Sequence, residues 1–341
     1  MSAQRVMVAM SGGVDSSVAA ALLKTQGFDV CGVTCALFPG QNDTVPSAQA
    51  VARHLDIPLE VLDLSALFIH KVVTPFCRDY SAGRTPNPCV YCNRFIKFGA
   101  LLDYVHTHGE CSLATGHYAR LGHAQGYQLL QAADKTKDQS YFLHTLNQRQ
   151  LAATIFPLGE IAKTEVRGLA DKFGLSGLIR QEESQDLCFV PDGDYASFVT
   201  SHQEAEAGEI VDPGGQVLGR HRGLAYYTVG QRKGLGITSP TPLYVMRLDA
   251  IHNQVVVGPH EALFQSQLTA REVTWISEVP PTDLSGITAR VRYKSPEVAA
   301  SIAFTSNTLE VKLLTPQWGI APGQSIVFYR GEEVLGGGII E

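Results

Sequence analysis

The chain has 341 residues, of which 45% are hydrophobic and 18% charged, and its formal net charge is −6. This length predicts two or three domains. No apolar run is long enough for a membrane helix, and the first residues lack the pattern of a secretory signal. We therefore expect a cytoplasmic protein without membrane association. The acidic total disfavours a wholly basic nucleic-acid binder, and seven cysteines in a reducing compartment favour metal binding or thiol chemistry over a disulfide scaffold.

The first half of the sequence alternates strand and helix signals. Strands are predicted at 6–10, 30–37, 59–62 and 112–115, and helices at 15–25, 47–55, 148–154 and 163–173. This alternation predicts an α/β domain with a parallel sheet and helices on both faces. Ligands of such sheets bind beyond the carboxyl ends of the strands, so the turn after the first strand is the first candidate site.

The second half changes in texture. Around residues 205–219 glycine, proline and turn residues dominate, which indicates a domain boundary. Short alternating strands then follow at 268–276, 287–293, 299–305, 309–314 and 325–329. Their spacing predicts a small antiparallel β-barrel. We therefore divide the chain into an α/β domain (1–200), a small central domain (201–262) and a C-terminal barrel (263–341).

Residues 10–17, Met-Ser-Gly-Gly-Val-Asp-Ser-Ser, connect the first strand to the first helix. The glycines allow a tight turn, and N–H groups at the helix start together with the serine hydroxyls can hold phosphate oxygens. The spacing matches neither the kinase-type loop nor the dinucleotide fingerprint. A plain glycine turn with a helix cap is the structural alternative, and Asp15 could be a magnesium partner or a cap.

Two cysteines lie in residues 84–93, Arg-Thr-Pro-Asn-Pro-Cys-Val-Tyr-Cys-Asn, where prolines and asparagines predict a loop. A helix is predicted to begin at Asn93. Cys92 would then lie at a helix N-terminus, with Lys97 and two arginines close in sequence and no acid among them, and both influences would favour the thiolate. A distant thiol, Cys188, lies in the run Ser-Gln-Asp-Leu-Cys-Phe-Val.

These motifs carry a specific resemblance. Residues 10–17 resemble the pyrophosphate loop of the ATP pyrophosphatase superfamily, and Thr-Pro-Asn-Pro-x-x-x-Cys-Asn with Ser-Gln-Asp-x-Cys-Phe resembles the bacterial tRNA-specific 2-thiouridylase family. The similarity runs nearly end to end and includes residues 114–120, 137–141 and 226–236. It implies an adenine-nucleotide α-hydrolase-like domain and ATP-dependent 2-thiolation of the wobble uridine of tRNA. ATP would adenylate the C2 oxygen, and sulfur would then replace it, with AMP and pyrophosphate as the other products.

The resemblance also implies roles for the cysteines. Cys92 corresponds to the catalytic nucleophile and Cys188 to the persulfide carrier, which a sulfur-carrier protein or a cysteine desulfurase would load. Cys89 stands where many members have an aspartate that acts as a base, so that role does not transfer. Cys89, Cys92 and Cys188 could instead be three ligands of a [4Fe–4S] cluster, and structural zinc is a third alternative. The remaining cysteines, at 31, 35, 77 and 111, lie in apolar contexts and are predicted to be packing residues, except Cys35, whose position matches one that lines the adenosine pocket in the family.

By the same resemblance, ATP with Mg²⁺ would be bound by Ala9, Met10, Ser11, Gly12, Gly13, Val14, Asp15, Ser16, Cys35 and Gly116. The anticodon region of tRNA would be contacted by Asn87, Pro88, Cys89, His117, Lys137, Asp138, Gln139, Arg292, Tyr293 and Gln324. Residues 219–236 add a basic segment with interleaved tyrosines and no acid, which is typical of phosphate and base contacts. For His117, and for residues 292–294 on a predicted barrel strand, a purely structural role is the alternative, and residues 137–139 could equally be a solvated helix cap. We expect a monomer.

Two other classes of function share part of these features. A small-molecule adenylating ligase would need the phosphate loop but neither Cys92 nor Cys188. A non-catalytic, metal-dependent RNA-binding module would not need residues 11–17. Nucleotide-dependent chemistry on RNA is expected of a thiouridylase and of neither of these two classes, so it would distinguish them.

Overall fold

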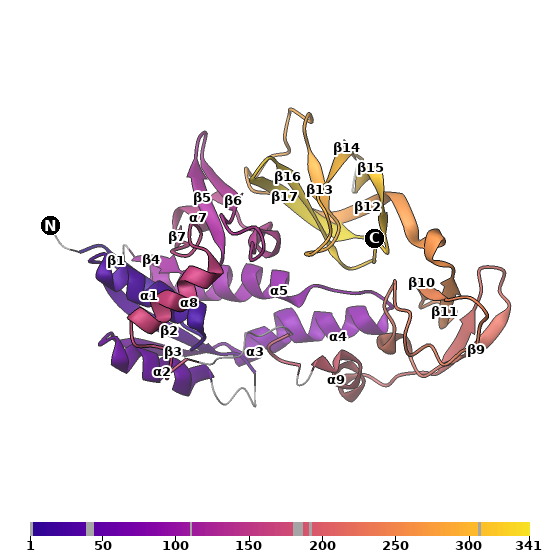
Figure 1. Cartoon of the computed structure of the whole chain (residues 1–341), viewed down its shortest axis with the longest axis horizontal. Helices are drawn as coiled ribbons and strands as arrows, with labels where there is room; N and C mark the ends of the chain where they lie inside the picture. The colour runs from indigo at the N-terminus through magenta and orange to yellow at the C-terminus, as the bar shows by residue number, and fades with distance from the viewer. Residues whose placement is uncertain (1–2, 39–43, 110, 180–186, 191–192, 306–307) are drawn as a thin grey trace.

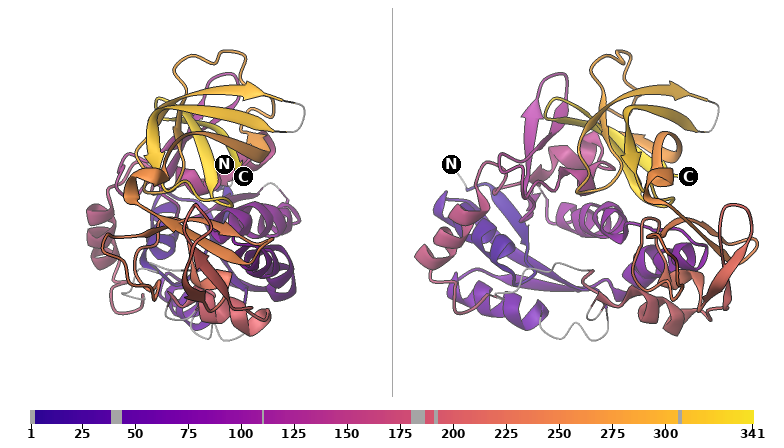
Figure 2. Two further views of the ribbon diagram at one scale, coloured as in Figure 1. Left: turned by 90° about the vertical axis from the view of Figure 1, so that its right-hand side faces the viewer. Right: turned by 45° about the vertical axis from the view of Figure 1, so that its right-hand side comes forward.

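The computed structural model has three parts, an α/β domain, a small central sheet and a C-terminal barrel (Figure 1). The parallel sheet lies at one end of the long axis and the central sheet at the other, with the barrel between them along this axis (Figures 1 and 2). Among the described residues no helix is both long and apolar enough to cross a membrane. The structure describes residues 3–38, 44–109, 111–179, 187–190, 193–305 and 308–341.

The α/β domain is built on a five-stranded parallel sheet. Its strands, in spatial order, are β3 (Leu59–Asp63), β2 (Asp29–Ala36), β1 (Arg5–Ala9), β4 (Cys111–Ala114) and β7 (Thr154–Ile155). The central strand β1 pairs with β2 on one side and β4 on the other. Its residues Val6, Met7 and Val8 are at most 1% exposed, as expected for a strand that is covered on both faces. The predicted parallel sheet is confirmed.

Helices cover both faces of this sheet. One face buries Val6 and Val8 against apolar residues of α1 (Val14–Thr25), α2 (Thr44–His54) and α8 (Lys163–Lys172). The other face buries Met7 against η2 (Cys92–Leu101), a π-helix, together with α6 (Leu102–His106) and α7 (Gln148–Ala152). The short helices α3 (Ser65–Phe68), η1 (Ile69–Val73), α4 (Thr74–Ser81) and α9 (Tyr195–His202) share a separate aromatic core.

The helix that carries the paired cysteines begins earlier than the sequence predicted. We expected a loop through residue 92 and a helix from Asn93, but α5 (Pro88–Tyr91) already forms the first turn and η2 continues it. Proline suits the first helical position because its φ is fixed and the N–H it lacks would have no partner there. Asn87 is the extended residue before the helix, with φ −110° and ψ 91°. Cys92 is therefore inside a helix and not at its N-terminus.

The central and C-terminal parts are all-β. The central sheet has the order β10 (Tyr244–Asp249), β11 (Gln254–Gly258), β8 (Gly208–Val211) and β9 (Val217–His221). Six strands close into the barrel because β12 pairs with both β15 and β17. They are β12 (Phe264–Trp275), β15 (Leu309–Trp318), β14 (Val298–Phe304), β13 (Thr288–Arg290), β16 (Ser325–Arg330) and β17 (Glu333–Ile340). The predicted antiparallel barrel is confirmed.

Two details of the barrel differ from the expectation. Strand β13 ends at Arg290, because Ser295 Oγ accepts hydrogen bonds from the N–H groups of Val291 and Arg292 and turns the chain. Residues 292–294 are therefore on a turn and not on a strand. The last strand, β17, was not predicted because three consecutive glycines weaken a strand signal. A Cβ at Gly336 would lie 2.1 Å from the carbonyl oxygen of Thr274, so the glycine allows β12 and β17 to close the barrel.

A hairpin of the α/β domain extends the barrel sheet. Its strands are β5 (Ala119–His123) and β6 (Tyr127–Gln131), and β6 pairs with β17 through Leu129 and Val334. Figure 1 shows this hairpin beside the barrel. Arg120 and Lys135 both reach the carboxylate of Glu332 at 2.6 Å, and they lower its pKa to about 2. The α/β domain and the barrel are thus joined by shared strands as well as by side chains.

Candidate active site

The phosphate loop folds around its own serine hydroxyls. Ser16 Oγ accepts from the N–H of Ser11 at 3.2 Å and donates to the carbonyl of Gly13 at 3.1 Å, and Ser17 Oγ donates to the same carbonyl at 2.9 Å. Gly12 has φ +72°, and a Cβ there would lie 2.3 Å from Ser47 Cβ. Among the described residues no side-chain hydrogen bond caps α1, so its first N–H groups keep the capacity to bind an anion.

The other residues expected to bind ATP lie at the same edge of the sheet. Ala9 and Met10 follow β1, and Cys35 lies near the end of the neighbouring strand β2. Gly116 follows β4, and a Cβ there would lie 2.7 Å from the backbone nitrogen of Ser16. Only glycine therefore fits between this connection and the start of α1. The structure brings together every predicted ATP residue.

Asp15 has partners that the sequence did not reveal. Its carboxylate accepts from Lys163 Nζ at 2.7 and 2.8 Å and from the hydroxyl of Tyr118 at 2.7 Å. The Lys163 side chain is 7% exposed and comes from the start of α8. Asp15 does not cap α1, since no side-chain cap bond is present. Lys163 is 148 residues from Asp15, so only the fold reveals this ion pair beside the phosphate loop.

The three cysteines of interest lie close enough to affect one another. Charge on Cys188 raises the pKa values of both Cys89 and Cys92. Cys92 is buried, whereas Cys89 and Cys188 are exposed. Residues 184–186 of the Cys188 motif lie outside the described part of the chain. The structure thus brings the distant thiol to the helix that carries the other two.

The thiols are not poised as thiolates, and this corrects the prediction for Cys92. Burial raises the pKa of Cys92 to about 12 and that of Cys89 to about 11. Lys97 acts in the opposite direction on both thiols but is outweighed. Desolvation penalises the charged form, and Cys92 lies inside the helix, so the predicted influence of a helix N-terminus is absent. Cys89 is exposed, and yet the protein atoms around it desolvate its thiol enough to raise the pKa.

The cysteines in this arrangement do not fit a metal centre. Within the described part of the chain, no three His, Cys, Asp or Glu side chains are grouped so that they could hold a metal ion. A [4Fe–4S] cluster or a zinc ion requires convergent thiolates, and Cys89, Cys92 and Cys188 are not grouped in that way among the described residues. We therefore derive no chemical step through a metal at Cys89, Cys92 and Cys188.

The barrel holds the loop that precedes the cysteine helix. Gln324 Nε2 donates to the carbonyl of Thr85 at 2.7 Å, and the N–H of Thr85 donates to the carbonyl of Pro322 at 2.7 Å. A Cβ at Gly323 would lie 3.0 Å from both Arg84 Cβ and the Thr85 nitrogen, so the two segments are in close contact. Gln324 thus links the barrel to the segment that leads to Asn87, Pro88 and Cys89.

Several residues expected to contact tRNA are used inside the protein. Asp138 is 2% exposed, and its carboxylate accepts from the N–H of Ala132 at 3.0 Å and from Ser140 Oγ at 2.9 Å. Gln139 Oε1 accepts from the N–H of Tyr118 at 3.1 Å. Lys137, next to them, is partly exposed. The carboxylate of Asp138 therefore shapes the loop and has no surface for tRNA in this conformation.

The turn after β13 joins the barrel to the other domains. Arg292 donates to the carbonyls of Val229 and Gly319, and its guanidinium lies 5.9 Å from the ring of Trp318. Burial lowers the pKa of Arg292. The Tyr293 ring packs 4.4 Å from that of Phe142 in the α/β domain. Both residues thus lie at domain junctions.

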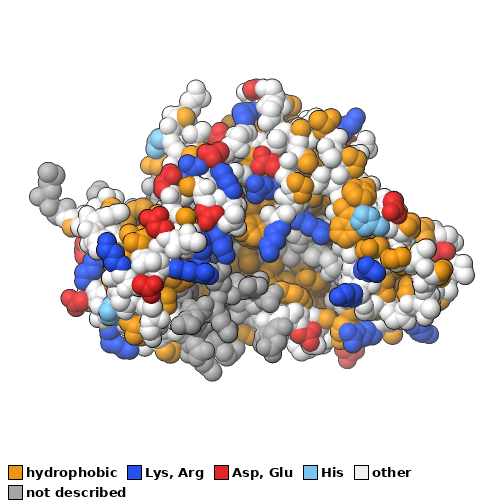
Figure 3. Space-filling model, in the orientation of Figure 1, with side chains coloured by type: hydrophobic (Ala, Val, Ile, Leu, Met, Phe, Trp, Pro, Cys, Tyr) orange, Lys and Arg blue, Asp and Glu red, His pale blue; other side chains and the backbone are white. Residues whose placement is uncertain are grey.

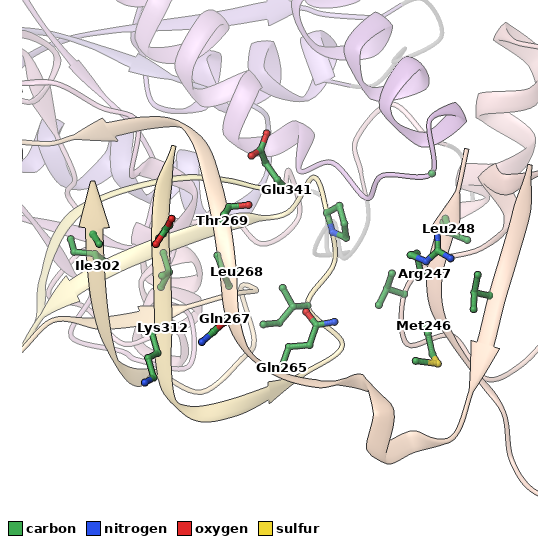
Figure 4. A pocket seen from close by; sticks show the side chains of 18 of the residues that line it. Met246, Arg247, Leu248, Gln265, Gln267, Leu268, Thr269, Ile302, Lys312 and Glu341 are labelled. Carbon is green, nitrogen blue, oxygen red and sulfur yellow. The ribbon is translucent and has the colours of Figure 1, made fainter. Parts of the chain in front are cut away.

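The surface is basic and hollowed between the domains. Figure 3 shows Lys and Arg side chains gathered along the border of a hollow in the middle of one face, between the α/β domain and the barrel. A separate cleft of about 940 Å³ lies between the central sheet and the barrel. Met246 and Leu248 line one wall of that cleft and Gln265 and Leu268 the other (Figure 4). None of the predicted site residues lines it.

Comparisons with known proteins agree with these features. A family model described as "tRNA methyl transferase HUP domain" matches residues 4–192. Others described as "tRNA methyl transferase PRC-barrel domain" and "Aminomethyltransferase beta-barrel domain" match residues 196–259 and 265–340. A solved structure of the U34-tRNA thiolase NcsA from Methanococcus maripaludis with its [4Fe–4S] cluster covers 59% of this chain and 64% of its own, with 20% identity and a TM-score of 0.38, which is too low to support an inference.

Curated relatives match over the full length. The tRNA-specific 2-thiouridylase MnmA of Magnetococcus marinus is 49% identical over 99% of both chains. The enzyme of the same name from Syntrophotalea carbinolica is 46% identical over 99% of this chain and 98% of its own. The resemblance found in the motifs is thereby confirmed, and the chain belongs to the tRNA-specific 2-thiouridylase family.

Proposed function

We propose that this chain is an ATP-dependent tRNA-uridine 2-sulfurtransferase that acts on the wobble uridine in the cytoplasm. The observation that carries the proposal is one α/β domain that combines a pyrophosphate-type loop at the carboxyl edge of its sheet with interacting thiols at Cys92 and Cys188. The names of relatives that are 46–49% identical over the full length support the same activity. A small-molecule ligase would not need the thiols, and an RNA-binding module would not need the loop.

Adenylation is the first step. The C2 oxygen of the uridine attacks the α-phosphorus of ATP, the new O–P bond forms and the bond to pyrophosphate breaks. N–H groups at the start of α1 bind the phosphate oxygens that gain charge in this step. Mg²⁺, when bound with ATP, would offset the charge of the leaving pyrophosphate, and Asp15 is the carboxylate of the loop that could hold it. The uridine must leave its stack to reach this edge, as bases generally do for such chemistry.

Sulfur transfer is the second step. A persulfide donor first converts Cys188 to a persulfide, whose terminal sulfur attacks C2 as AMP leaves, so that a C–S bond replaces the C–O bond. The sulfur of Cys92 then attacks Cys188 Sγ, the persulfide S–S bond breaks, and the thiocarbonyl keeps the electron pair. The product enzyme holds a Cys92–Cys188 disulfide, which a thiol reductant must reduce with two electrons. Burial raises the pKa of Cys92, so little of this thiol is ionised before the attack.

We further propose a monomer whose domains, at 1–200, 201–262 and 263–341, all contact one tRNA. Asn87, Pro88 and Cys89 would meet the target base, since they begin the helix that carries Cys92. The partly exposed Lys137 and the basic segment 219–236 would bind the backbone. Gln324 and Arg292 would act mainly through the domain junctions that they hold.

The function is tested by supplying purified protein with ATP, unmodified tRNA and a persulfide donor. We expect one 2-thiouridine and one pyrophosphate per turnover, with no thiolation in C92S or C188S. C31A is the matched control, because Cys31 lies on β2 outside the site and should leave activity in place. Thiolation that requires about four irons per chain would replace the relay by the [4Fe–4S] alternative. Adenylation of a small molecule without tRNA would support the ligase.

A further inference from the structure

Lys97 is turned toward the site by an unusual helix. It lies five residues after Cys92 in η2, a π-helix over Cys92–Leu101 that is interrupted by non-helical backbone at Gly99, two residues beyond Lys97. In a π-helix the backbone bonds join residues five apart, so Lys97 lies roughly one turn above Cys92 and on a similar face. In an α-helix five residues make about 1.4 turns, which would carry Lys97 to the other side. Short π-helical segments are frequent at functional sites.

A chain of hydrogen bonds orients the ammonium group of Lys97. Lys97 Nζ lies 3.4 Å from His117 Nε2, and His117 Nδ1 lies 2.8 Å from Thr115 Oγ1. An ammonium can only donate, so Nε2 accepts, and Nδ1 carries the proton that it donates to Thr115. Burial and the charge of Lys97 lower the pKa of His117 well below its usual value, so the ring is neutral and can accept. His117 is 9% exposed, which makes it a positioning residue and not a surface contact for tRNA.

The ammonium lies between the phosphate loop and the thiols. His117 follows Gly116, which is in contact with the start of α1. On the other side, burial raises the pKa values of Cys35 at the end of β2 and of Cys89 and Cys92, and the charge of Lys97 opposes that rise in all three. Unlike Lys163, Lys97 forms no ion pair with a carboxylate within the residues that the structure describes. Its charge is therefore available to an anionic group at this point.

We propose that Lys97 is a catalytic residue whose ammonium binds the α-phosphoryl oxygens of ATP and then of the adenylated uridine. This inference rests on the proposed function. As the uridine O2–P bond forms and the bond to pyrophosphate breaks, charge spreads over the oxygens of the α-phosphoryl group, and the N3 proton of the uridine passes to solvent. In the second step the same ammonium stabilises AMP as it leaves C2. Lys97 acts in both steps as an electrostatic group.

The test is the rate of pyrophosphate release in a single turnover with saturating ATP and tRNA and no sulfur donor. This assay isolates adenylation from the thiols. We expect release by K97Q to be about 100- to 1,000-fold slower, the usual loss when one such donor is removed, and K97R to recover part of the rate. K172Q is the matched control, because Lys172 is exposed in the last turn of α8, and it should match the wild type.

Three outcomes would overturn the proposal. If K97Q releases pyrophosphate at the wild-type rate but thiolates slowly, Lys97 acts on the thiols alone. A raised KM for tRNA with an unchanged kcat would make it a tRNA contact. Absence of tRNA-dependent release in the wild-type protein would remove the proposed function and this inference with it. The melting temperature and the Kd for a non-hydrolysable ATP analogue establish whether K97Q is folded. If K97Q is unfolded, K97M, which keeps the side-chain length, takes its place.

Discussion

Gly116 is the position at which a single methyl group should disable ATP binding. A Cβ there would lie 2.7 Å from the Ser16 nitrogen and 2.8 Å from the carbonyl carbon of Asp15. Both are backbone atoms of α1, so no side chain can swing away, and either the helix start or the connection after β4 must shift. Overpacking of this kind costs about 1–3 kcal/mol. If that cost falls on the nucleotide-binding conformation, G116A should weaken ATP binding by about 5- to 150-fold.

The assay is calorimetric titration of G116A with a non-hydrolysable ATP analogue, together with the KM for ATP in thiolation. The matched control is G168A, because Gly168 lies inside α8 and a Cβ there would meet nothing within 4 Å. That variant should bind ATP as the wild type does and gain up to about 1 kcal/mol of stability from helix propensity. An unchanged Kd for G116A in a folded protein would refute the argument that this close contact shapes the nucleotide site.

Three further predictions follow from the site. D15N should lower both the melting temperature and the affinity for ATP, because it leaves Lys163, whose side chain is 7% exposed, without its carboxylate. An unchanged melting temperature would contradict a stabilising role for this ion pair. Q324A should lower the free energy of unfolding by about 0.5–1.5 kcal/mol, because it removes the hydrogen bond to Thr85, and urea unfolding would measure this loss. Steady-state kinetics should show that Q324A impairs thiolation more than ATP binding. Alkylation of Cys92 by iodoacetamide should stay slow from pH 7 to about 9 in the folded protein, because its pKa is raised to about 12. In urea the alkylation rate should follow the ordinary thiol pKa of about 8.5. Peptide mapping that finds the alkylation rate of folded protein reaching a plateau below pH 9 would oppose this.

The phosphate loop could be predicted from the sequence because its determinants are local. Two glycines, a strand before them and a helix after them specify the turn, and the structure reproduces that order in β1 and α1. The parallel sheet was likewise predictable from alternating strand and helix signals. Strand β17 was missed because its role depends on Gly336 fitting against Thr274, a contact between strands far apart in the sequence.

The cysteine helix shows where local reasoning failed. Asn93 is a good cap in isolation, but Pro88 begins the helix and Asn93 is 2% exposed inside it. The pKa of Cys92 could not be predicted either, because it depends on how deeply the packed helix is buried. The sequence prediction for Cys92 gave its charged neighbours too much weight, because desolvation raises the thiol pKa more than these charges lower it.

Residues that act through long-range contacts were invisible to sequence patterns. Lys163 lies in an ordinary amphipathic helix, and only the fold reveals its pair with Asp15. His117 was expected at tRNA, but its ring nitrogens face Thr115 and Lys97. A lysine that follows a cysteine by five residues carries no signal unless the π-helix is known.

In the proposed reaction, ATP-dependent thiolation proceeds through Cys92 and Cys188 as a pair. The most direct test is non-reducing peptide mass spectrometry after one turnover of persulfide-loaded, iron-free protein with ATP and tRNA. We predict a Cys92–Cys188 disulfide in the same molar amount as 2-thiouridine, and neither product when ATP is omitted. Full thiolation with both thiols still reduced would show that Cys92 does not release sulfur from Cys188.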